Sequence, residues 1–561
     1  MLGSSPKHYS GTNLAAGGAG GGRMMLALVT AGSVGGLLFG YDTGIISGAL
    51  VLLSHEFSLT TLEQELVVSI CIAGAFVSAA VSGYLSDQYG RRLVVLASSV
   101  AFVLGSVLLC VATNTALLYA GRFVVGLGVG SASMIVPVLL SECAPAESRG
   151  AVVTCVNVAI TLGQMLACGT AGLLSRNPYG WRIMLGIAAI PAVFQFLCFF
   201  FVIPESPRWL IAQGFVDKGT TALRQLRNVI DVRAELVEIL ASVQSEKDAI
   251  AAEFGRRSRQ RERERLETLR RSDFDSTNAK ANKAGAGAGE SGDAGDGDGK
   301  SKGGSTLSPL PQPLAPPYQK QLEDLSPYGE HGSPLSTQPP VEVACGKMSF
   351  WENLVAKSTI RRALYIGIVL QITQQLAGIN TVMYYSAVIF HGTGIVSQST
   401  AIWLTLGTAF FNFIGSALGH RLTDRTGRRP LTLFSLLAVV VCLAGIAGTF
   451  YFNDLVLDVT TSSNSSTRRA LSSGDPLSGS GEQGKIWSVF AAICVYLLVF
   501  SIGVGSTPWT YCSEIFPLSV RGVAASVTTS TNWLANFAVS VTFLTVVNRL
   551  GVVGSFLFYA W

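Results

Sequence analysis

Two ionisable residues stand inside long apolar stretches of the sequence, where a charge is costly. Asp42 lies in the apolar run 24–54, and Arg122 lies in the run 116–140. An ionised side chain inside a membrane costs several kcal/mol unless it is paired. Counted from the outer ends of their runs, both lie at comparable depth, so they could form an ion pair. Such a pair could load and release a proton when its distance changes, or it could be a static structural contact.

A second set of polar residues consists of amides and aromatic groups. The apolar run 361–390 carries Gln374, Gln375, Asn380, Tyr384 and Tyr385, each of which needs a hydrogen-bond partner when buried. Uncharged donors and acceptors beside an apolar face suit the hydroxyls of a polyol or a sugar. The same amides could instead join neighbouring helices. Other apolar runs add Gln164, Asn412, Asn532, Trp509 and Trp533 to this set.

Long apolar runs must position these residues. Hydrophobic residues make up 49% of the chain and charged residues 13%, against about 25% charged residues in soluble domains. Runs of about 20 residues are long enough to cross a hydrocarbon core. We find them at 24–54, 65–86, 93–113, 116–140, 150–174, 182–203, 361–390, 400–420, 430–451, 487–512 and 522–547. A twelfth run begins near Val552, and because the sequence ends at Trp561 we expect a truncated twelfth helix.

The chain repeats itself. The segment GYLSDQYGRR (83–92) resembles DRTGRR (424–429), and each is followed by a glutamate and an arginine seven residues apart. A duplicated six-helix unit is typical of transporters. The sequence therefore predicts an all-α membrane protein built from two six-helix bundles.

Basic residues cluster after the even-numbered runs, which places those loops in the cytoplasm. The outer loop 453–485 contains Asn464 in an Asn-Ser-Ser sequence, a glycosylation candidate. In chain order we predict a disordered cytoplasmic N-terminus (1–23), a first bundle (24–203), cytoplasmic linker helices (204–254), a disordered low-complexity insert (255–345) and a second bundle that includes the outer loop (346–561).

Seven motifs stand out: FGYDTGIISG (39–48), GYLSDQYGRR (83–92), AGRFVVGLGVG (120–130), PESPRWL (204–210), QQLAGINTVMYYS (374–386), DRTGRR (424–429) and PWTYCSEIFPLSVRG (508–522). Together they resemble the sugar porter family of the major facilitator superfamily. The outer loop 453–485 and the segments 361–390 and 530–544 most resemble its proton myo-inositol cotransporter branch. The resemblance implies the major facilitator fold. One departure is that the outer loop 453–485 contains no cysteine, whereas many members of that branch carry a cysteine-rich module there.

The resemblance also implies roles for individual residues. Asp42 takes up the proton and Arg122 is its partner. The positions that contact the sugar are Gln164, Gln374, Gln375, Asn380, Asn412 and Trp509, with Phe39, Tyr384, Asn532 and Trp533 as further contributors. The charged residues that form a cytoplasmic gate are Asp87 with Arg91 and Arg92, Glu142 with Arg149, Glu205 with Arg208, Asp424 with Arg428 and Arg429, and Glu514 with Arg521.

From these features we predict proton-coupled symport of myo-inositol or a related polyol or sugar. The alternatives are a proton-coupled hexose symporter, a facilitative hexose carrier and a sugar sensor that does not transport. A membrane enzyme is disfavoured because the sequence shows no nucleophile or metal-binding constellation. We expect a small polyol or monosaccharide substrate, protons and the lipid bilayer as partners, no nucleic acid, no cofactor and no metal. We further expect a monomer in the plasma membrane.

Overall fold

The computed structural model describes residues 21–145, 148–229, 231–285, 358–392, 397–453, 480–517 and 520–560. They belong to two compact units. One contains residues 1–248 and 348–561 and holds all the membrane helices, and the other contains residues 249–347. Ten helices of the described part are long and apolar enough to cross a membrane. The protein is therefore an integral membrane protein that crosses the bilayer several times.

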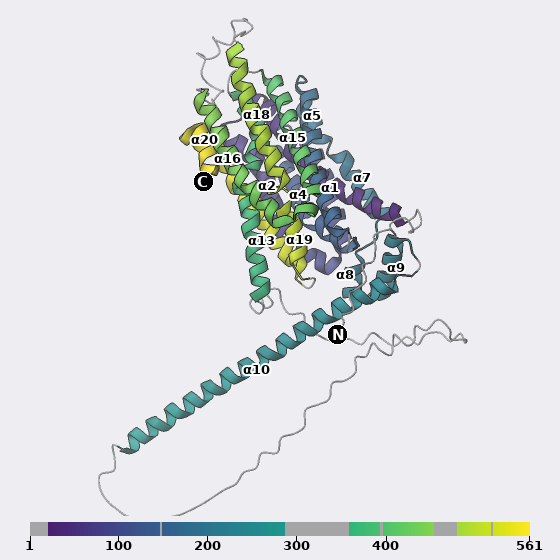
Figure 1. The fold of residues 1–561 in the computed structure, drawn as a ribbon, viewed down its shortest axis with the longest axis vertical. Coiled ribbons are helices and arrows are strands. Elements are labelled where there is room, and N and C mark those ends of the chain that lie inside the picture. Colours follow the sequence, from purple (N-terminus) through teal and green to yellow (C-terminus); the bar gives the residue numbers. More distant parts are fainter. Residues whose placement is uncertain are drawn as a thin grey trace, which may run out of the picture. The chain divides into compact units, whose positions relative to one another are not determined.

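The first bundle contains the six expected crossings, the last of them in two pieces (Figure 1). Polar side chains cap two of these helices: Thr60 forms a capping box with Glu63, and Asn114 accepts a hydrogen bond from the N–H of Leu117. The helices are α1 (Gly21–Glu56), α2 (Thr61–Tyr89), α3 (Arg91–Cys110), α4 (Thr115–Cys143), α5 (Arg149–Leu174), α6 (Gly180–Gly186) and α7 (Ala189–Phe201).

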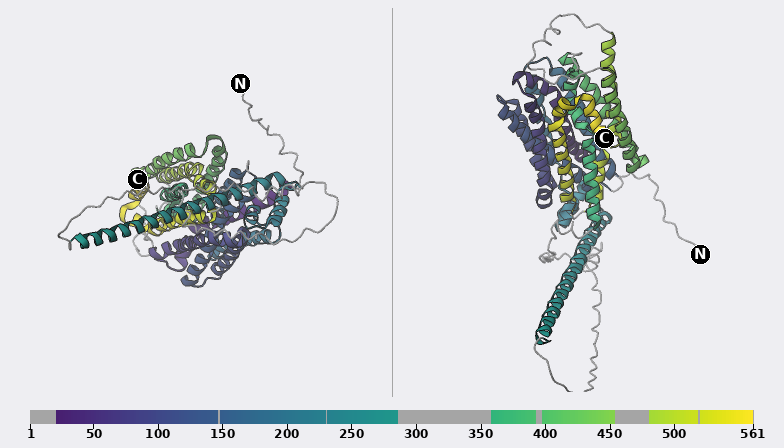
Figure 2. Two further views of the ribbon diagram at one scale, coloured as in Figure 1. Left: turned by 90° about the horizontal axis from the view of Figure 1, so that it is seen from below. Right: turned by 90° about the vertical axis from the view of Figure 1, so that its left-hand side faces the viewer.

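The second bundle repeats this order, and its helices pack beside those of the first bundle in both views of Figure 2. The run 361–390 is divided at Gly378, whose φ of 79° favours glycine. A second kink lies at Gly551, with φ 70°, before the helical residues 552–560. The helices are α13 (Ser358–Leu376), α14 (Ile379–Gly392), α15 (Gln398–Thr426), α16 (Arg428–Phe452), α18 (Ser480–Ile502), α19 (Thr507–Ile515) and α20 (Arg521–Ala560).

The linker after α7 forms α8 (Pro207–Ala212), α9 (Val216–Arg227) and α10 (Arg233–Gly285). Apolar side chains of the first part of α10, such as Ile239, pack against Ile211 and Leu223. The prediction of disorder from residue 255 is wrong as far as Gly285, because α10 continues to that residue. Glu, Arg, Gln and Leu favour helix without any buried face, and Gln260 donates to Glu264 one turn away at 3.0 Å.

Three other predictions concern residues outside the described part of the chain. They are the disordered N-terminus up to residue 20, the remainder of the insert from 286 to 345, and most of the outer loop, including Asn464.

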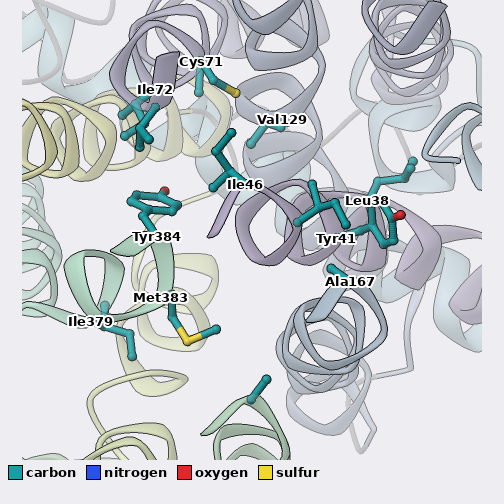
Figure 3. Close-up of a cluster of buried hydrophobic side chains, with 14 of the residues drawn as sticks. Leu38, Tyr41, Ile46, Cys71, Ile72, Val129, Ala167, Ile379, Met383 and Tyr384 are labelled. Atoms are coloured by element: carbon teal, nitrogen blue, oxygen red, sulfur yellow. The ribbon is translucent and has the colours of Figure 1, made fainter. Parts of the chain in front are cut away.

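Glycines let the helices of the first bundle approach closely. A Cβ on Gly126 of α4 would lie 2.1 Å from the carbonyl oxygen of Cys71 on α2. A Cβ on Gly40 of α1 would lie 1.8 Å from the carbonyl oxygen of Ile160 on α5. Close approach through small residues is the usual way in which membrane helices gain packing energy. These contacts bring α2 against α4 and α1 against α5, and the four helices surround one buried cluster, part of which Figure 3 shows.

We predict that Gly126→Ala lowers the melting temperature of the purified protein, because the added methyl group meets backbone and overpacking costs about 1–3 kcal/mol. Gly445→Ala on α16 is the matched control, since a Cβ there has no atom within 4 Å. A thermal melt should show a lower melting temperature for Gly126→Ala and an unchanged one for Gly445→Ala. Equal melting temperatures for the two variants would contradict this view of the packing.

Candidate functional site

The two membrane charges meet. Arg122 Nη1 donates to Asp42 Oδ1 at 2.5 Å, and Arg122 Nε donates to the carbonyl oxygen of Val67 at 3.2 Å. The Cys71 thiol donates to the other carboxylate oxygen, Oδ2, at 3.3 Å. Asp42 is 8% exposed and Arg122 is 2% exposed. The structure thus brings together the two charges that the sequence placed at similar depth.

The glycine spacing of α1 explains why Asp42 turns toward α2 and α4. Gly40 and Gly44 lie one turn apart on the face of α1 that packs on the backbone of α5. A residue two positions away points to the other side of a helix. The side chain of Asp42 therefore points away from α5 and faces the N-terminal halves of α2 and α4, where Cys71 and Arg122 are its partners.

A cavity lies between the two bundles and is lined mainly by uncharged polar groups. Nine of the ten predicted substrate residues line it: Phe39, Gln164, Gln374, Gln375, Asn380, Asn412, Trp509, Asn532 and Trp533. The tenth, Tyr384, is buried behind the lining and accepts a hydrogen bond from Asn536 at 3.1 Å. Among the described residues no charged side chain lines this cavity.

Sequence analysis missed several lining residues, including Asn157, Thr161 and Asn536. Helical spacing could have found them. Asn536 follows Asn532 by four positions on α20, and Asn157 precedes Gln164 by seven positions on α5, so each pair shares a face.

The amides of the second bundle bind one another. Gln375 Nε2 donates to Asn532 Oδ1 at 3.0 Å, and Asn380 Nδ2 donates to Gln375 Oε1 at 2.6 Å. Asn532 Nδ2 donates to Gln374 Oε1 at 3.0 Å and to Gln371 Oε1 at 2.7 Å. The helix break at Gly378 separates Gln375 on α13 from Asn380 on α14. It therefore lets these two side chains form a hydrogen bond with each other. A polyol could replace some of these bonds without leaving a buried amide unpaired.

Other hydrogen bonds cross between the bundles at the cavity. Asn412 Nδ2 donates to Gln164 Oε1 at 2.7 Å, and Trp533 Nε1 donates to Ser133 Oγ at 3.1 Å. The rings of Phe39 and Trp533 lie 5.1 Å apart between centroids. These contacts fix the distance between the two halves of the cavity.

The bundles also touch on both sides of the cavity. At the end predicted to face outward, Ser47 and Ser386 lie within hydrogen-bonding distance at 3.1 Å. At the cytoplasmic end, a Cβ on Gly83 would lie 2.4 Å from the carbonyl oxygen of Gly522. The Asp87 carboxylate also lies against Gly522, at the start of α20, where the helix dipole favours a negative charge.

One predicted cytoplasmic ion pair, that of Asp87 with Arg91, is formed, but several others differ from the prediction. Arg91 binds Glu142 through two hydrogen bonds, of 3.0 and 3.1 Å, and lies 3.0 Å from Asp87. Glu142 also accepts from Ser206 Oγ at 2.6 Å. The predicted pair of Glu142 with Arg149 is not formed, because the buried Arg91 already occupies the carboxylate.

Glu205 and Glu514 also have other partners than predicted. Glu205 accepts the backbone N–H groups of Arg91, Arg92 and Ser206 rather than the side chain of Arg208. Burial raises the pKa of Glu205, while these N–H donors lower it. Glu514 pairs with Arg428 instead of Arg521.

Arg208 and Arg521 do not pair with Glu205 and Glu514, the described glutamates predicted as their partners. Arg521 donates to the carbonyl oxygen of Phe516 at 3.2 Å. Burial, followed by the charges of Arg149 and Arg521, lowers the pKa of Arg208. Arg429 is exposed, and the side chain of Asp424 lies outside the described part of the chain.

Comparison with known proteins identifies the family. The family model described as "Sugar (and other) transporter" matches residues 28–268 and 340–561. The chain belongs to this sugar transporter family. It is 32% identical to the human proton myo-inositol cotransporter over 94% of the chain and 76% of that protein. It is 30% identical to the probable inositol transporter 2 of Arabidopsis thaliana, over 95% of the chain and 86% of that protein.

The fold of the transporter is that of the major facilitator superfamily. The chain is similar to the proton:xylose symporter XylE, with a TM-score of 0.64 and 21% identity over 96% of this chain and 93% of that one. Another structure of XylE from E. coli, described as partially occluded and inward open, gives a TM-score of 0.63 at 21% identity, covering 96% of this chain and 95% of that one. The predicted fold class is confirmed.

We predict that Arg91→Ala destabilises the transporter much more than Arg149→Ala. Removing Arg91 leaves the Glu142 carboxylate, which is 2% exposed, without a cation, and such a loss costs about 3–5 kcal/mol. Arg149 is the matched arginine with no ion pair among the described residues. Thermal melts in detergent measure the difference. Similar losses for both variants would show that Arg149, too, carries a structural ion pair.

Proposed function

We propose that the protein is a secondary active transporter that moves myo-inositol or a related polyol together with protons, by alternating access, across the plasma membrane. The observation that carries this proposal is a buried Asp42–Arg122 pair beside an uncharged, amide-lined cavity enclosed between two bundles. Its relatives include proteins named proton myo-inositol cotransporter and inositol transporter, which supports this substrate class.

The lining of the cavity supports a substrate with many hydroxyls. Amides such as Gln164, Gln375 and Asn380 offer both donors and acceptors, as a hydroxyl does. Trp509 and Trp533 add apolar faces for the carbon ring. A carboxylate or phosphate substrate would find no cation among the described lining residues.

The ion pair supports coupling to protons. Arg122 is the cation that pairs with Asp42 among the described residues, so in the buried state the carboxylate is compensated by Arg122 or by a proton. A movement of α1 against α4 that lengthens the 2.5 Å contact would leave a buried carboxylate that favours protonation. A neutral Asp42 would then allow the bundles to move with less electrostatic cost.

Uptake in proteoliposomes tests the proposal. Labelled myo-inositol should enter faster with an inward proton gradient than without one, and labelled glucose should enter more slowly under both conditions. Glucose uptake that depends on the gradient and exceeds that of myo-inositol would favour a hexose symporter. Uptake of myo-inositol that ignores the gradient would favour a facilitative carrier, and binding without any uptake would favour a sensor.

We predict that Asp42→Asn abolishes accumulation against a gradient and leaves exchange of labelled for unlabelled substrate. The amide keeps the shape of the carboxylate but does not exchange a proton. Counterflow in proteoliposomes measures exchange, and uptake under a proton gradient measures accumulation. Accumulation at the unmodified level in this variant would contradict the role of Asp42.

We predict that Gln375→Ala weakens substrate binding about 5- to 150-fold, equivalent to about 1–3 kcal/mol for an unpaired buried partner. Gln195→Ala is the matched control, because Gln195 is a buried membrane amide that binds Ala31 and Ser99 outside the cavity. The dissociation constants of the two variants, measured by ligand binding to purified, folded protein, are compared with that of the unmodified protein. An unchanged dissociation constant for Gln375→Ala would remove this residue from the site.

A further inference from the structure

Glu65 is a buried carboxylate outside the cavity and outside the Asp42–Arg122 pair. It lies four residues after Thr61, the first residue of α2, and is 2% exposed. No ion pair to Glu65 is formed within the described part of the chain. An ionisable group buried in a membrane helix without an opposite charge is expensive, so its presence points to a function.

Its partners belong to the other bundle. The backbone N–H of Thr545 on α20 donates to Glu65 Oε1 at 3.0 Å. The hydroxyl oxygen of Thr545 lies 3.3 Å from each carboxylate oxygen. Because α2 and α20 are in different bundles, these bonds exist only while the outer ends of the bundles touch. Opening the cavity to the outside would break them and admit water to Glu65.

The geometry suits a protonated Glu65. In the neutral acid, Oε1 accepts the N–H of Thr545, and a proton on Oε2 can be donated to the Thr545 hydroxyl oxygen at 3.3 Å. Every polar atom of the acid then has a partner. The ionised form would need a cation in this buried place, and a hydroxyl and one N–H compensate a charge only in part.

The charged and titratable groups on the packed helices do not supply that cation. Arg122 on α4 is bound to Asp42 of α1 and to the Val67 carbonyl. The Tyr385 phenol on α14 donates to the Ser540 carbonyl at 3.2 Å. Arg549 is exposed one turn beyond Thr545 on α20, and His55 and Glu56 are exposed at the outer end of α1. Arg91 and Arg92 on α3, Arg521 at the start of α20 and Glu142 near the end of α4 lie at the cytoplasmic end.

We propose that Glu65 is a second proton-binding group of the transport cycle, which takes a proton from external water as the outer ends of α2 and α20 close and returns it as they open. The step forms one O–H bond on Glu65 and consumes one external proton. This proposal for Glu65 rests on the alternating access of the proposed function but not on the identity of the substrate. Acidic external solution should therefore favour the closed outer side.

Spin labels at Leu62→Cys and Leu550→Cys report this closure, since both positions are exposed at the outer ends of α2 and α20. The exposed Cys110 is replaced by serine, and Asp42→Asn removes the other carboxylate. In this background the short-distance population should grow as the external pH is lowered. Adding Glu65→Gln should remove the pH dependence and keep the short distance, because the amide reproduces both bonds of the neutral acid.

Thr545→Val provides a second test that keeps the carboxyl group. It removes the acceptor of the acid proton but leaves the backbone N–H, so the ratio of closed to open protein at acidic pH should fall about fivefold, the effect of one hydrogen bond. An unchanged ratio would count against the proposed contact.

Two results would overturn the proposed role of Glu65, and they differ in what they say about alternating access. If the label distance responds to myo-inositol in the chain with native Asp42, but its pH dependence survives Glu65→Gln, Glu65 is not the proton-binding group and alternating access stands. If the distance responds neither to pH nor to myo-inositol, both the proposal and alternating access are wrong.

Discussion

The structure depends on one constraint, which is that a charge buried in the membrane must be compensated where it lies. Asp42 and Arg122 satisfy each other at 2.5 Å, with the Cys71 thiol and the Val67 carbonyl as further partners. To bring these groups together, α1, α2 and α4 must pack closely, and glycines such as Gly126 permit that approach. The pair is therefore both a product of the packing and a feature that any movement of these helices would disturb.

The cavity differs from this ion pair, because the described residues that line it are uncharged. Its amides and indoles come from both bundles, and in this structure they bind one another across the divide, as Asn412 and Gln164 do. The two bundles also contact each other at the end predicted to face outward and at the cytoplasmic end. The cavity and the Asp42–Arg122 pair thus occupy separate places, and a hydrogen bond from Asn536 of the lining to Tyr384 of the buried cluster links the lining to that cluster.

Much of this arrangement could be predicted from the sequence, because periodic apolar runs and repeated motifs report membrane helices directly. The amide positions around Gln375 followed from their unusual presence in an apolar run. The gate partners could not be predicted, since seven-residue spacing does not show that the buried Arg91 reaches Glu142 before Arg149 does. Glu65 was missed because it stands at the edge of its run, where a carboxylate is typical of a loop, and α10 was missed beyond residue 254 because composition alone does not exclude an exposed helix.

The most direct test of the central claim is whether substrate and proton move together. A pH-sensitive dye inside proteoliposomes that contain the purified protein, with no membrane potential, reports proton entry when myo-inositol is added outside. Coupled transport predicts acidification of the lumen that follows the entry of labelled myo-inositol in time and saturates with it. Entry of labelled myo-inositol with no change in internal pH would contradict the account.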